Sequence, residues 1–275
     1  MRTGQPSRTA LAAARYRADH QDLEGGNIFR DPLARAIVGE TGPDERYTER
    51  WRERMRGYIA VRARFAEDAL AAAAARGIGQ TVILGAGLDT FAYRNPHPGL
   101  RVFEVDHPDT QTWKRERLAR AGIEIPDSVA YVPVDFERDA LGASLTAAGL
   151  DPARPTFVIW LGVTVYLTRA AIDETLRVLG GLAPDTELVF DYGPPIPPAP
   201  TAELRAVHEE RERRLAAVGE RWISFFTPEQ IAEILSDNGF AVAEDLSVVE
   251  LASRYVGRAA PTTAGPRLIR ACVVR

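Results

Sequence analysis

Cysteine and lysine are almost absent from this chain of 275 residues. Cys272 is its one cysteine, and Lys114 is the one lysine among 34 basic side chains. A lone thiol cannot form an internal disulfide or build a zinc or iron–sulfur centre. We therefore expect no metal site, and we interpret Cys272, within the apolar run LIRACVV, as a small buried hydrophobe.

Long apolar runs and an excess of positive charge are absent as well. No uninterrupted stretch approaches the ~20 apolar residues of a membrane helix, and the apolar piece 10–14 is too short for a signal-peptide core. The chain has 34 basic and 38 acidic side chains, and this balance argues against a nucleic-acid-binding surface. The sequence predicts a cytoplasmic protein without a membrane or nucleic-acid partner, and it leaves the oligomeric state open.

The first 75 residues are typical of helices, because their apolar side chains recur at helical spacing. Asp31 followed by Pro32 is a common helix start, and Gly77 and Gly79 are typical of a helix end. We expect an N-terminal helical extension, 1–75, with helices within 9–20, 31–39 and 46–75.

Short apolar runs alternate with helical stretches from residue 80 onward. The runs at 81–85 and 157–163 are apolar on both faces, which suits strands covered by helices on each side. Such alternation is typical of an α/β fold with a doubly wound parallel sheet. We expect strands within 81–87, 101–107, 129–136, 156–163, 186–192, 240–250 and 267–274, and helices within 108–121, 169–182 and from 228 onward.

A proline-rich segment interrupts this pattern after the fifth strand. GPPIPPAP, at 193–200, cannot lie inside a regular helix or strand, and a charged helical stretch, 201–218, follows it. We interpret 193–227 as an inserted excursion, and 257–265 as a loop. Residues 76–275 then form one sheet domain.

The turn after the first strand is rich in glycine, and acidic residues end the next two strands. In an open α/β sheet a ligand binds beyond the carboxyl ends of the strands, where the strand order reverses. Gly85 and Gly87 let the backbone approach a ligand, because neither carries a Cβ. Glu104 and Asp106 follow where a carboxylate accepts hydrogen bonds from ribose hydroxyls. We favour Asp106, which is closer to the strand end, and Asp135 is the third acid, with a helix cap as its alternative role.

Asp89 and Thr90 discriminate between two nucleoside cofactors. A dinucleotide places its pyrophosphate at the N-terminus of the first helix, usually beside a third glycine. Here Thr90 takes that place, and the Asp89 carboxylate would repel a diphosphate and compete for the same N–H groups. S-adenosylmethionine (SAM) has no phosphate and carries a positive sulfonium, which suits an acidic rim. The residues favour SAM, and an NAD(P)-dependent oxidoreductase is the alternative.

Four motifs stand out between residues 82 and 168: VILGAGLDTFAYR (82–94), VFEVDHPDTQTWKRERL (102–118), YVPVDFE (131–137) and WLGVTVYLT (160–168). They resemble the leucine carboxyl methyltransferase superfamily. They are most similar to its bacterial branch of SAM-dependent O-methyltransferases, which includes tetracenomycin-type polyketide enzymes. The resemblance implies a class I methyltransferase fold, mostly parallel with an antiparallel last strand, in which the N-terminal helices and the inserted segment cover the cofactor.

The resemblance also implies a set of cofactor contacts. Arg62 matches an arginine that pairs with the carboxylate of SAM, which a guanidinium can grip with two N–H bonds; a solvated helix arginine is the alternative. Arg15 or Arg17 is a candidate for a second positive contact. The other implied contacts are Gly85, Ala86 and Gly87 at the methionine part, Asp106 at the ribose, and Asp135 with Phe136 at the adenine.

One position departs from the family pattern. Many members have an acidic residue before the glycine that follows the fourth strand, whereas this chain has Leu161 before Gly162. A leucine can cover the adenine or the methionine stem, but it cannot accept a hydrogen bond from the amine of SAM. We expect the amine to rely on backbone carbonyls near Gly85 and on other acceptors.

The sequence does not single out a catalytic base. Methyl transfer from a sulfonium needs mainly an acceptor aligned ~3 Å from the methyl carbon. A carboxylate acceptor requires no base, whereas a phenol or alcohol would be helped by one. His107 and His20 are candidate bases, with a helix cap as the alternative role of His107. Further candidates are Tyr166 for catalysis, and Tyr166, Tyr192 and Phe225 for lining the acceptor site, with core packing as the alternative.

We therefore predict a SAM-dependent O-methyltransferase that acts by in-line displacement. Its acceptor would be a carboxylate or hydroxyl of a small molecule, such as a polyketide or another secondary metabolite. A SAM-binding protein without transfer activity, or one with other chemistry at the SAM site, is the alternative that Leu161 and the missing base suggest.

Overall fold

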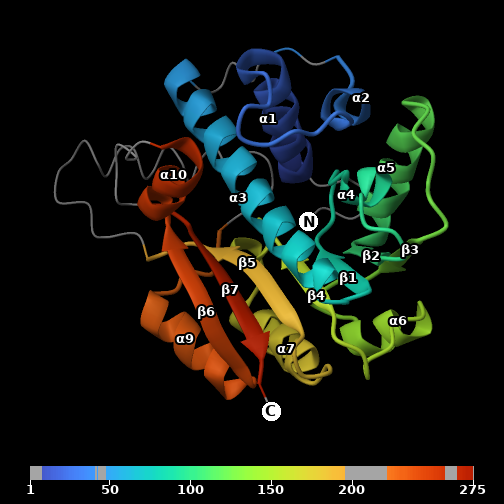
Figure 1. Cartoon of the computed structure of the whole chain (residues 1–275), viewed down its shortest axis with the longest axis vertical. Coiled ribbons are helices and arrows are strands. Elements are labelled where there is room, and N and C mark those ends of the chain that lie inside the picture. The colour runs from blue at the N-terminus through green and yellow to red at the C-terminus, as the bar shows by residue number, and fades with distance from the viewer. Residues whose placement is uncertain (1–7, 41, 43–47, 196–221, 258–264, 275) are drawn as a thin grey trace.

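Seven strands form one sheet in the centre of the molecule (Figure 1). This computed structural model describes residues 8–40, 42, 48–195, 222–257 and 265–274. The strand order is β3-β2-β1-β4-β5-β7-β6; β7 is antiparallel to both of its neighbours, and β1 to β5 pair in parallel. The strands are β1 (Gln80–Leu84), β2 (Arg101–Asp106), β3 (Val129–Pro133), β4 (Phe157–Trp160), β5 (Glu187–Tyr192), β6 (Phe240–Ser247) and β7 (Arg267–Val273). The expected doubly wound sheet with an antiparallel last strand is confirmed.

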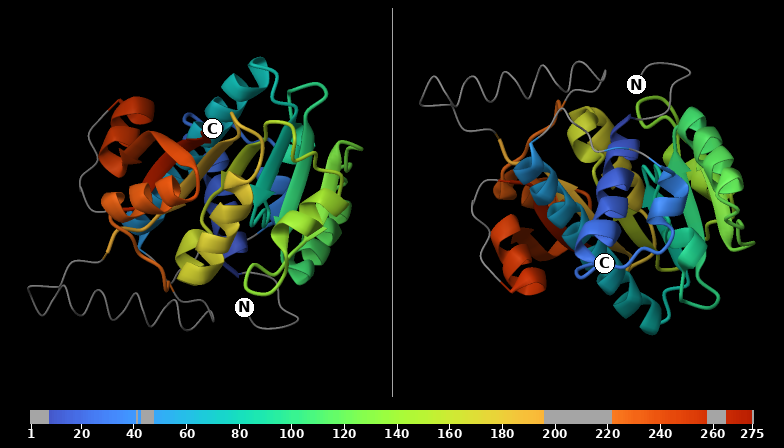
Figure 2. Two further views of the ribbon diagram at one scale, coloured as in Figure 1. Left: turned by 90° about the horizontal axis from the view of Figure 1, so that it is seen from below. Right: turned by 90° about the horizontal axis from the view of Figure 1, so that it is seen from above.

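The N-terminal helices lie on one side of this sheet. Figure 2 (right) shows α1 (Arg8–Glu24) and α2 (Ala34–Val38) on the same side as α3 (Glu49–Ala75). Ala14 and Ala18 of α1 and Ile37 of α2 form an apolar cluster with Leu118 of α5 (Pro108–Arg120) and with Leu88 of the glycine-rich turn. The helical extension is therefore packed against the turn where a ligand is expected.

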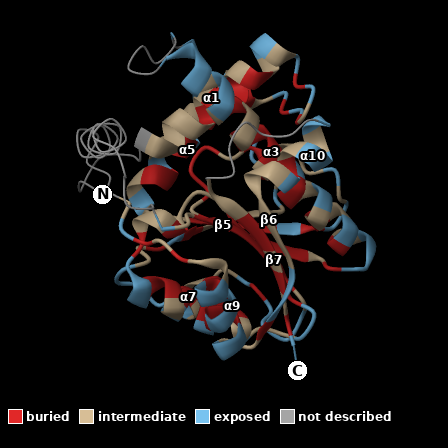
Figure 3. Cartoon of the chain, turned by 90° about the vertical axis from the view of Figure 1, so that its left-hand side faces the viewer, coloured by how far each residue is buried: buried red, intermediate tan, exposed pale blue. Residues whose placement is uncertain are grey.

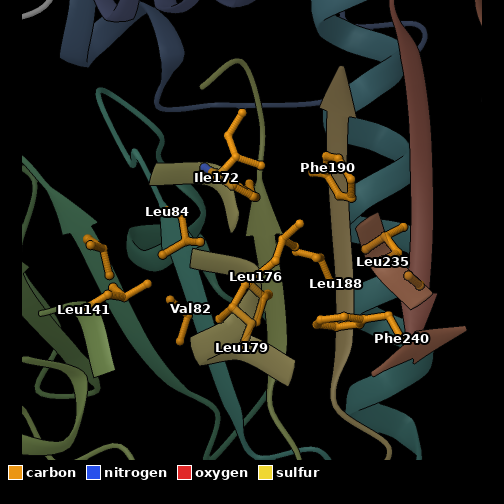
Figure 4. Close-up of a cluster of buried hydrophobic side chains, with 14 of the residues drawn as sticks. Val82, Leu84, Leu141, Ile172, Leu176, Leu179, Leu188, Phe190, Leu235 and Phe240 are labelled. Carbon is orange, nitrogen blue, oxygen red and sulfur yellow. The ribbon is translucent and has the colours of Figure 1, made fainter. Parts of the chain in front are cut away.

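Helices cover both faces of the sheet, which explains why the central strands are buried along their whole length (Figure 3). One face carries α6 (Leu141–Ala147), α7 (Arg169–Gly180) and α9 (Pro228–Asp237); the other carries α3, α4 (Phe91–Arg94), α5 and α10 (Val248–Val256). On the face that carries α7, Val82 and Leu188 of the strands pack against Leu176 and Leu179 of this helix (Figure 4). Apolar burial of this kind is the main driving force for folding.

The strand expected within 240–250 is present as β6 and ends at Ser247, where a capping box between Ser247 and Glu250 starts α10. Two other local expectations differ from the structure. The second helix begins at Ala34 rather than directly after Asp31, whose Oδ1 accepts from the N–H of Leu33 at 3.1 Å in the turn before the helix. Cys272 is half-buried on β7 rather than fully buried.

Parts of the inserted excursion and of the last loop lie outside the described residues, including the helix expected at 201–218. Among the described helices, none is long and apolar enough to cross a membrane. No group of three His, Cys, Asp or Glu side chains in the described ranges could hold a metal ion.

Candidate functional site

Two glycine-containing turns meet where the strand order reverses, between β1 and β4. Gly85, at φ +65°, follows β1, and a Cβ at this position would collide with Val163, which follows β4. Gly162 has φ +71°, and a Cβ there would lie 2.9 Å from both Nη1 and Nη2 of Arg62. Both positions therefore need glycine for conformation and for space. These two turns and the guanidinium of Arg62 form the centre of the candidate site, as the strand topology predicts.

Asp106, the last residue of β2, faces the glycine-rich turn. Its Oδ2 accepts a hydrogen bond from the backbone N–H of Gly87 at 2.6 Å, and its Oδ1 accepts one from the N–H of His107 at 2.7 Å. Burial raises the pKa of Asp106, and the two N–H donors oppose this rise. An ionised carboxylate offers about four acceptor positions, so Asp106 retains positions for two further donors.

Asp135 and Phe136 lie just beyond β3, beside Asp106 at the same edge of the sheet. Val134 donates its N–H to the Asp106 carbonyl oxygen at 2.9 Å, which places the two strand ends side by side. Asp135 Oδ1 accepts from the N–H of Glu137 at 3.1 Å, so the carboxylate closes a turn rather than capping a helix. Phe136 is half-buried against the sheet core. Both side chains are at the edge where the adenine contacts were expected.

Arg62 of α3 is paired with an acid rather than solvated. Its Nη1 lies 2.9 Å from Oδ2 of Asp191, a nearly buried residue of β5. The Tyr58 hydroxyl donates to the same Oδ2 at 2.8 Å, and the N–H of Gly162 donates to Oδ1 at 2.5 Å. Burial lowers the pKa of Arg62, but the charges and hydrogen bonds of Asp191 and Tyr58 together outweigh it, and the net shift is upward. We call Asp191, Tyr58 and Arg62 the β5 cluster.

Sequence reasoning missed two members of the β5 cluster. Tyr58 lies four residues before Arg62, a spacing that places both on one face of a helix. Asp191 comes near the end of an apolar strand, as Asp106 does. Both signals were present, but the pairing depends on α3 crossing β5, which local sequence does not specify.

A second arginine ties α1 to the glycine-rich turn. Arg17 donates from Nη2 to the Leu88 carbonyl oxygen at 2.6 Å, and its Nη1 lies 3.2 Å from Asp89 Oδ2. Its Nε lies 2.7 Å from Oδ2 of Asp31, which is fully buried and also accepts from the Thr90 hydroxyl. We call Arg17, Asp31 and Asp89 the α1 cluster. The three nitrogens of its guanidinium each contact a protein oxygen, and the second cofactor contact expected of Arg15 or Arg17 stays a prediction.

Asp89 also caps α4, the helix that follows β1. This position of its carboxylate is the one that disfavours a dinucleotide cofactor. Its Oδ1 accepts from the N–H of Phe91 at 2.8 Å, at the start of α4. Burial opposes ionisation of Asp89, but the positive charges of Arg17, Lys114 and Arg94 lower its pKa overall. A carboxylate thus occupies the helix N-terminus that a pyrophosphate would need.

The other acid of β2, Glu104, has a structural role. It is 1% exposed, and its Oε2 lies 2.8 Å from Nζ of Lys114, which is also 1% exposed. The Tyr93 hydroxyl donates to the same oxygen at 2.9 Å and meets the Tyr131 hydroxyl at 2.8 Å. The chain's one lysine therefore joins α5 to β2 beside Asp106.

The candidate bases have structural partners. His107 Nδ1 accepts from the N–H of Asp109 at 3.2 Å and caps α5, its alternative role. His20 is buried, with Nδ1 3.0 Å from Glu24 and Nε2 3.4 Å from the N–H groups of Ile28 and Phe29. Neither arrangement identifies a base, and His107 stays a candidate.

Two of the candidate acceptor-lining residues lie near each other. Tyr166 ends a short 3₁₀ turn, η1 (Thr164–Tyr166), and is half-buried. The N–H of Ile223 donates to the Val165 carbonyl oxygen at 2.8 Å, which places the segment containing Phe225 against this turn. Tyr192 instead packs in the core and donates its hydroxyl to Asp245 of β6 at 2.7 Å, so we do not retain it as a lining residue.

Comparison with protein families agrees with this geometry. The model of the family described as leucine carboxyl methyltransferase matches residues 10–180, which is more than half of the chain. The chain belongs to this family. The family match ends between β4 and β5, so it includes Arg62, Asp106 and Leu161 but not Asp191.

Curated relatives of this family member extend over most of its length. YktD of Bacillus subtilis is 31% identical over 90% of each chain, and a protein of Mycobacterium marinum is 34% identical over 86% of this chain and 82% of its own. A protein of Frankia alni is 39% identical over 64% of each chain. All three are named as S-adenosyl-L-methionine-dependent methyltransferases.

Solved structures show the same fold at low sequence identity. A DUF574 family protein of Streptomyces avermitilis superposes with a TM-score of 0.60 at 19% identity and covers 98% of each chain. Magnesium protoporphyrin IX methyltransferase of Synechocystis, with bound SAH, has a TM-score of 0.52 at 15% identity and covers 95% of this chain and 100% of its own. The expected family and the class I methyltransferase fold are confirmed.

Proposed function

We propose that this protein transfers the methyl group of SAM to a carboxylate or hydroxyl oxygen of a small molecule, such as a polyketide or another secondary metabolite. The protein is a SAM-dependent methyltransferase, as its family and its curated relatives show. That class was predicted from the sequence motifs. The oxygen acceptor and its chemical type are the proposal.

The residues at the sheet edge fit SAM. The observation that carries the proposal is Asp106, which keeps acceptor positions for the two ribose hydroxyls while Gly87 and His107 hold its carboxylate. In the described part of the chain Arg62 meets a protein carboxylate through Nη1, so its other N–H groups can bind the carboxylate of SAM. Gly85 has no Cβ, which lets the turn after β1 pack closely against Val163, and its contact with the methionine part stays a prediction.

Catalysis would consist mainly of alignment. SAM supplies an electrophilic methyl group on a positive sulfur, and the protein holds the acceptor oxygen in line with it. A carboxylate acceptor needs no proton transfer, which suits a site whose histidines are engaged in caps and turns. For a hydroxyl acceptor, His107 and Tyr166 are the candidates to assist.

Turnover and binding test this proposal. The purified protein is incubated with SAM and a panel of small carboxylic acids, phenols and alcohols, and S-adenosylhomocysteine (SAH) formation is measured. We expect turnover with at least one acceptor, and a loss of SAH affinity of about tenfold or more in Asp106→Ala, because a charged hydrogen-bond acceptor is removed. The control is Asp173→Ala, a carboxylate on the exposed side of α7 that pairs with Arg169.

Three results would contradict the proposal. SAH affinity that is unchanged in Asp106→Ala would exclude the ribose contact, and a preference for NAD(P) would favour the oxidoreductase. Tight SAM binding without turnover across the panel would favour a SAM-binding protein without transfer activity.

We also propose that the N-terminal helices cover the cofactor. A Cβ at Gly87 would lie 3.0 Å from Cβ of Ala10, so the start of α1 lies directly over the glycine-rich turn. Deletion of residues 1–20 should weaken SAM binding, measured by calorimetry, while circular dichroism shows that the sheet still folds. Unchanged affinity in a folded truncation would rule out this cover.

A further inference from the structure

We propose that Asp191 is a positioning residue: it holds Arg62 in the orientation that binds the carboxylate of SAM. This inference rests on the proposed function, because it requires Arg62 to contact the carboxylate of SAM. Asp191 lies beyond the residues that the family model matches.

The strand register brings Asp191 beside the position of the missing acid. β4 and β5 are parallel, with Trp160 opposite Phe190, so the next residues along the two strands are Leu161 and Asp191. The N–H of Gly162, directly after Leu161, donates to Asp191 Oδ1 at 2.5 Å. A carboxylate from β5 therefore lies against the turn where other family members carry one on β4.

Three donors from two elements define the direction of this carboxylate. Gly162 binds Oδ1, whereas Tyr58 and Arg62 of α3 bind Oδ2 at 2.8 and 2.9 Å. Asp191 is 6% exposed, and a buried charge is tolerated only when it is paired and hydrogen-bonded. Both carboxylate oxygens are engaged, so Asp191 cannot turn away without leaving a buried donor unpaired.

Arg62 is constrained from its other side by Gly162. The guanidinium lies against this residue, and a Cβ there would come within 2.9 Å of both Nη atoms. A planar guanidinium presents its five N–H groups in a rigid fork. Once Nη1 is fixed on Asp191, the remaining N–H directions are fixed too, which prepares the guanidinium for a second, bidentate carboxylate.

The experiment compares two ligands that differ in the amino-acid part. SAH carries the carboxylate, and 5′-methylthioadenosine has the same nucleoside without the amino-acid part. Affinities of both are measured by calorimetry for the full chain and for Asp191→Asn. We expect SAH affinity to fall by about tenfold or more, with 5′-methylthioadenosine affinity unchanged, because the ribose and adenine contacts are elsewhere.

A second mutation separates positioning from independent binding. If Asp191 acts through Arg62, the double variant Arg62→Ala/Asp191→Asn should bind SAH no more weakly than Arg62→Ala alone. Tyr58→Phe removes one hydrogen bond to the same carboxylate and should reduce SAH affinity by a smaller factor. This variant replaces Asp191→Asn in the test if Asp191→Asn does not fold.

The chain contains a matched control. Asp245 accepts from Tyr192 at 2.7 Å and from Arg267 Nε at 2.8 Å, an Asp–Tyr–Arg group of the same composition on β5, β6 and β7. Asp245→Asn should leave the ratio of SAH to 5′-methylthioadenosine affinity unchanged, whatever it does to stability.

The outcomes distinguish this inference from the proposed function. Wild-type protein that binds neither ligand overturns the proposed function and this inference with it. Wild-type binding with equal losses for both ligands, no loss in Asp191→Asn, tighter SAH binding, or additive losses in the double variant overturns the role of Asp191 alone.

Discussion

Arg17 and Arg62 reach the carboxyl ends of the central strands from two different helices, and their surroundings differ. In the α1 cluster, Nη1, Nη2 and Nε of Arg17 each lie within 3.2 Å of a protein oxygen. In the β5 cluster, Arg62 meets its protein carboxylate through Nη1. Burial and an acidic partner are therefore common to a structural arginine and to a candidate ligand-binding one. What separates them is the number of N–H groups that the protein itself uses.

The two clusters also face different parts of the fold. The α1 cluster joins the N-terminal extension to the turn after β1, and its carboxylates on Asp31 and Asp89 compensate the charge of Arg17 locally. The β5 cluster joins α3 to the turn after β4, where the guanidinium of Arg62 packs against Gly162, which has no Cβ. We therefore expect mutations in the first to reduce stability and mutations in the second to reduce affinity.

The largest expected effect is on stability, in Arg17→Met. This change leaves the fully buried carboxylate of Asp31 without its nearest cation, and breaking a buried ion pair costs about 3–5 kcal/mol. The free energy of unfolding is measured with urea. The control is Arg64→Ala, which breaks an exposed pair with Asp68 on α3 and should change stability by less than about 1 kcal/mol. Equal effects of the two variants would contradict the structural role of the α1 cluster.

The second effect is on ligand affinity, in Arg62→Ala. Loss of a charged, bidentate contact should weaken SAH binding by about tenfold to a hundredfold, whereas binding of 5′-methylthioadenosine should not change. Calorimetry with both ligands measures this difference, again with Arg64→Ala as the control. Equal weakening of both ligands would indicate that Arg62 supports the fold as Arg17 does, and the contrast between the two clusters would fail.

The smallest effect is a pH dependence at Asp106. Burial raises the pKa of this carboxyl, so its proton returns at a pH above the ordinary aspartate value of about 4. If the ionised form accepts the ribose hydroxyls, SAH affinity is complete at neutral pH and falls as the pH drops through the raised pKa. Asp106→Asn carries no titrating proton, so it should bind more weakly near pH 7 and lose this acid-induced decline. A decline that is identical in the variant would assign it to another group.

Much of the sheet edge could be predicted from local sequence. Asp106 ends a strand, Gly85 and Gly87 follow another, and parallel strands align their carboxyl ends at one edge of a sheet, so proximity followed from topology. Local sequence did not give the exact start of α2: Asp31 Oδ1 accepts from the N–H of Leu33, but the helix begins at Ala34. It also did not give the partners of Asp31 Oδ2, Arg17 and Thr90, which come from distant parts of the chain.

The sequence by itself determined the alternation of strands and helices, the glycines of the turn, and the acid at the end of β2, because each depends on periodicity or on conformational freedom over a few residues. Only the tertiary structure decided which charges meet. Lys114 pairs with Glu104, and Arg17 pairs with Asp31 and Asp89. Arg62 pairs with Asp191, which lies 129 residues away in the sequence. A buried charge needs a partner of opposite sign within a few ångströms, and which partner is near is set by how helices cross the sheet.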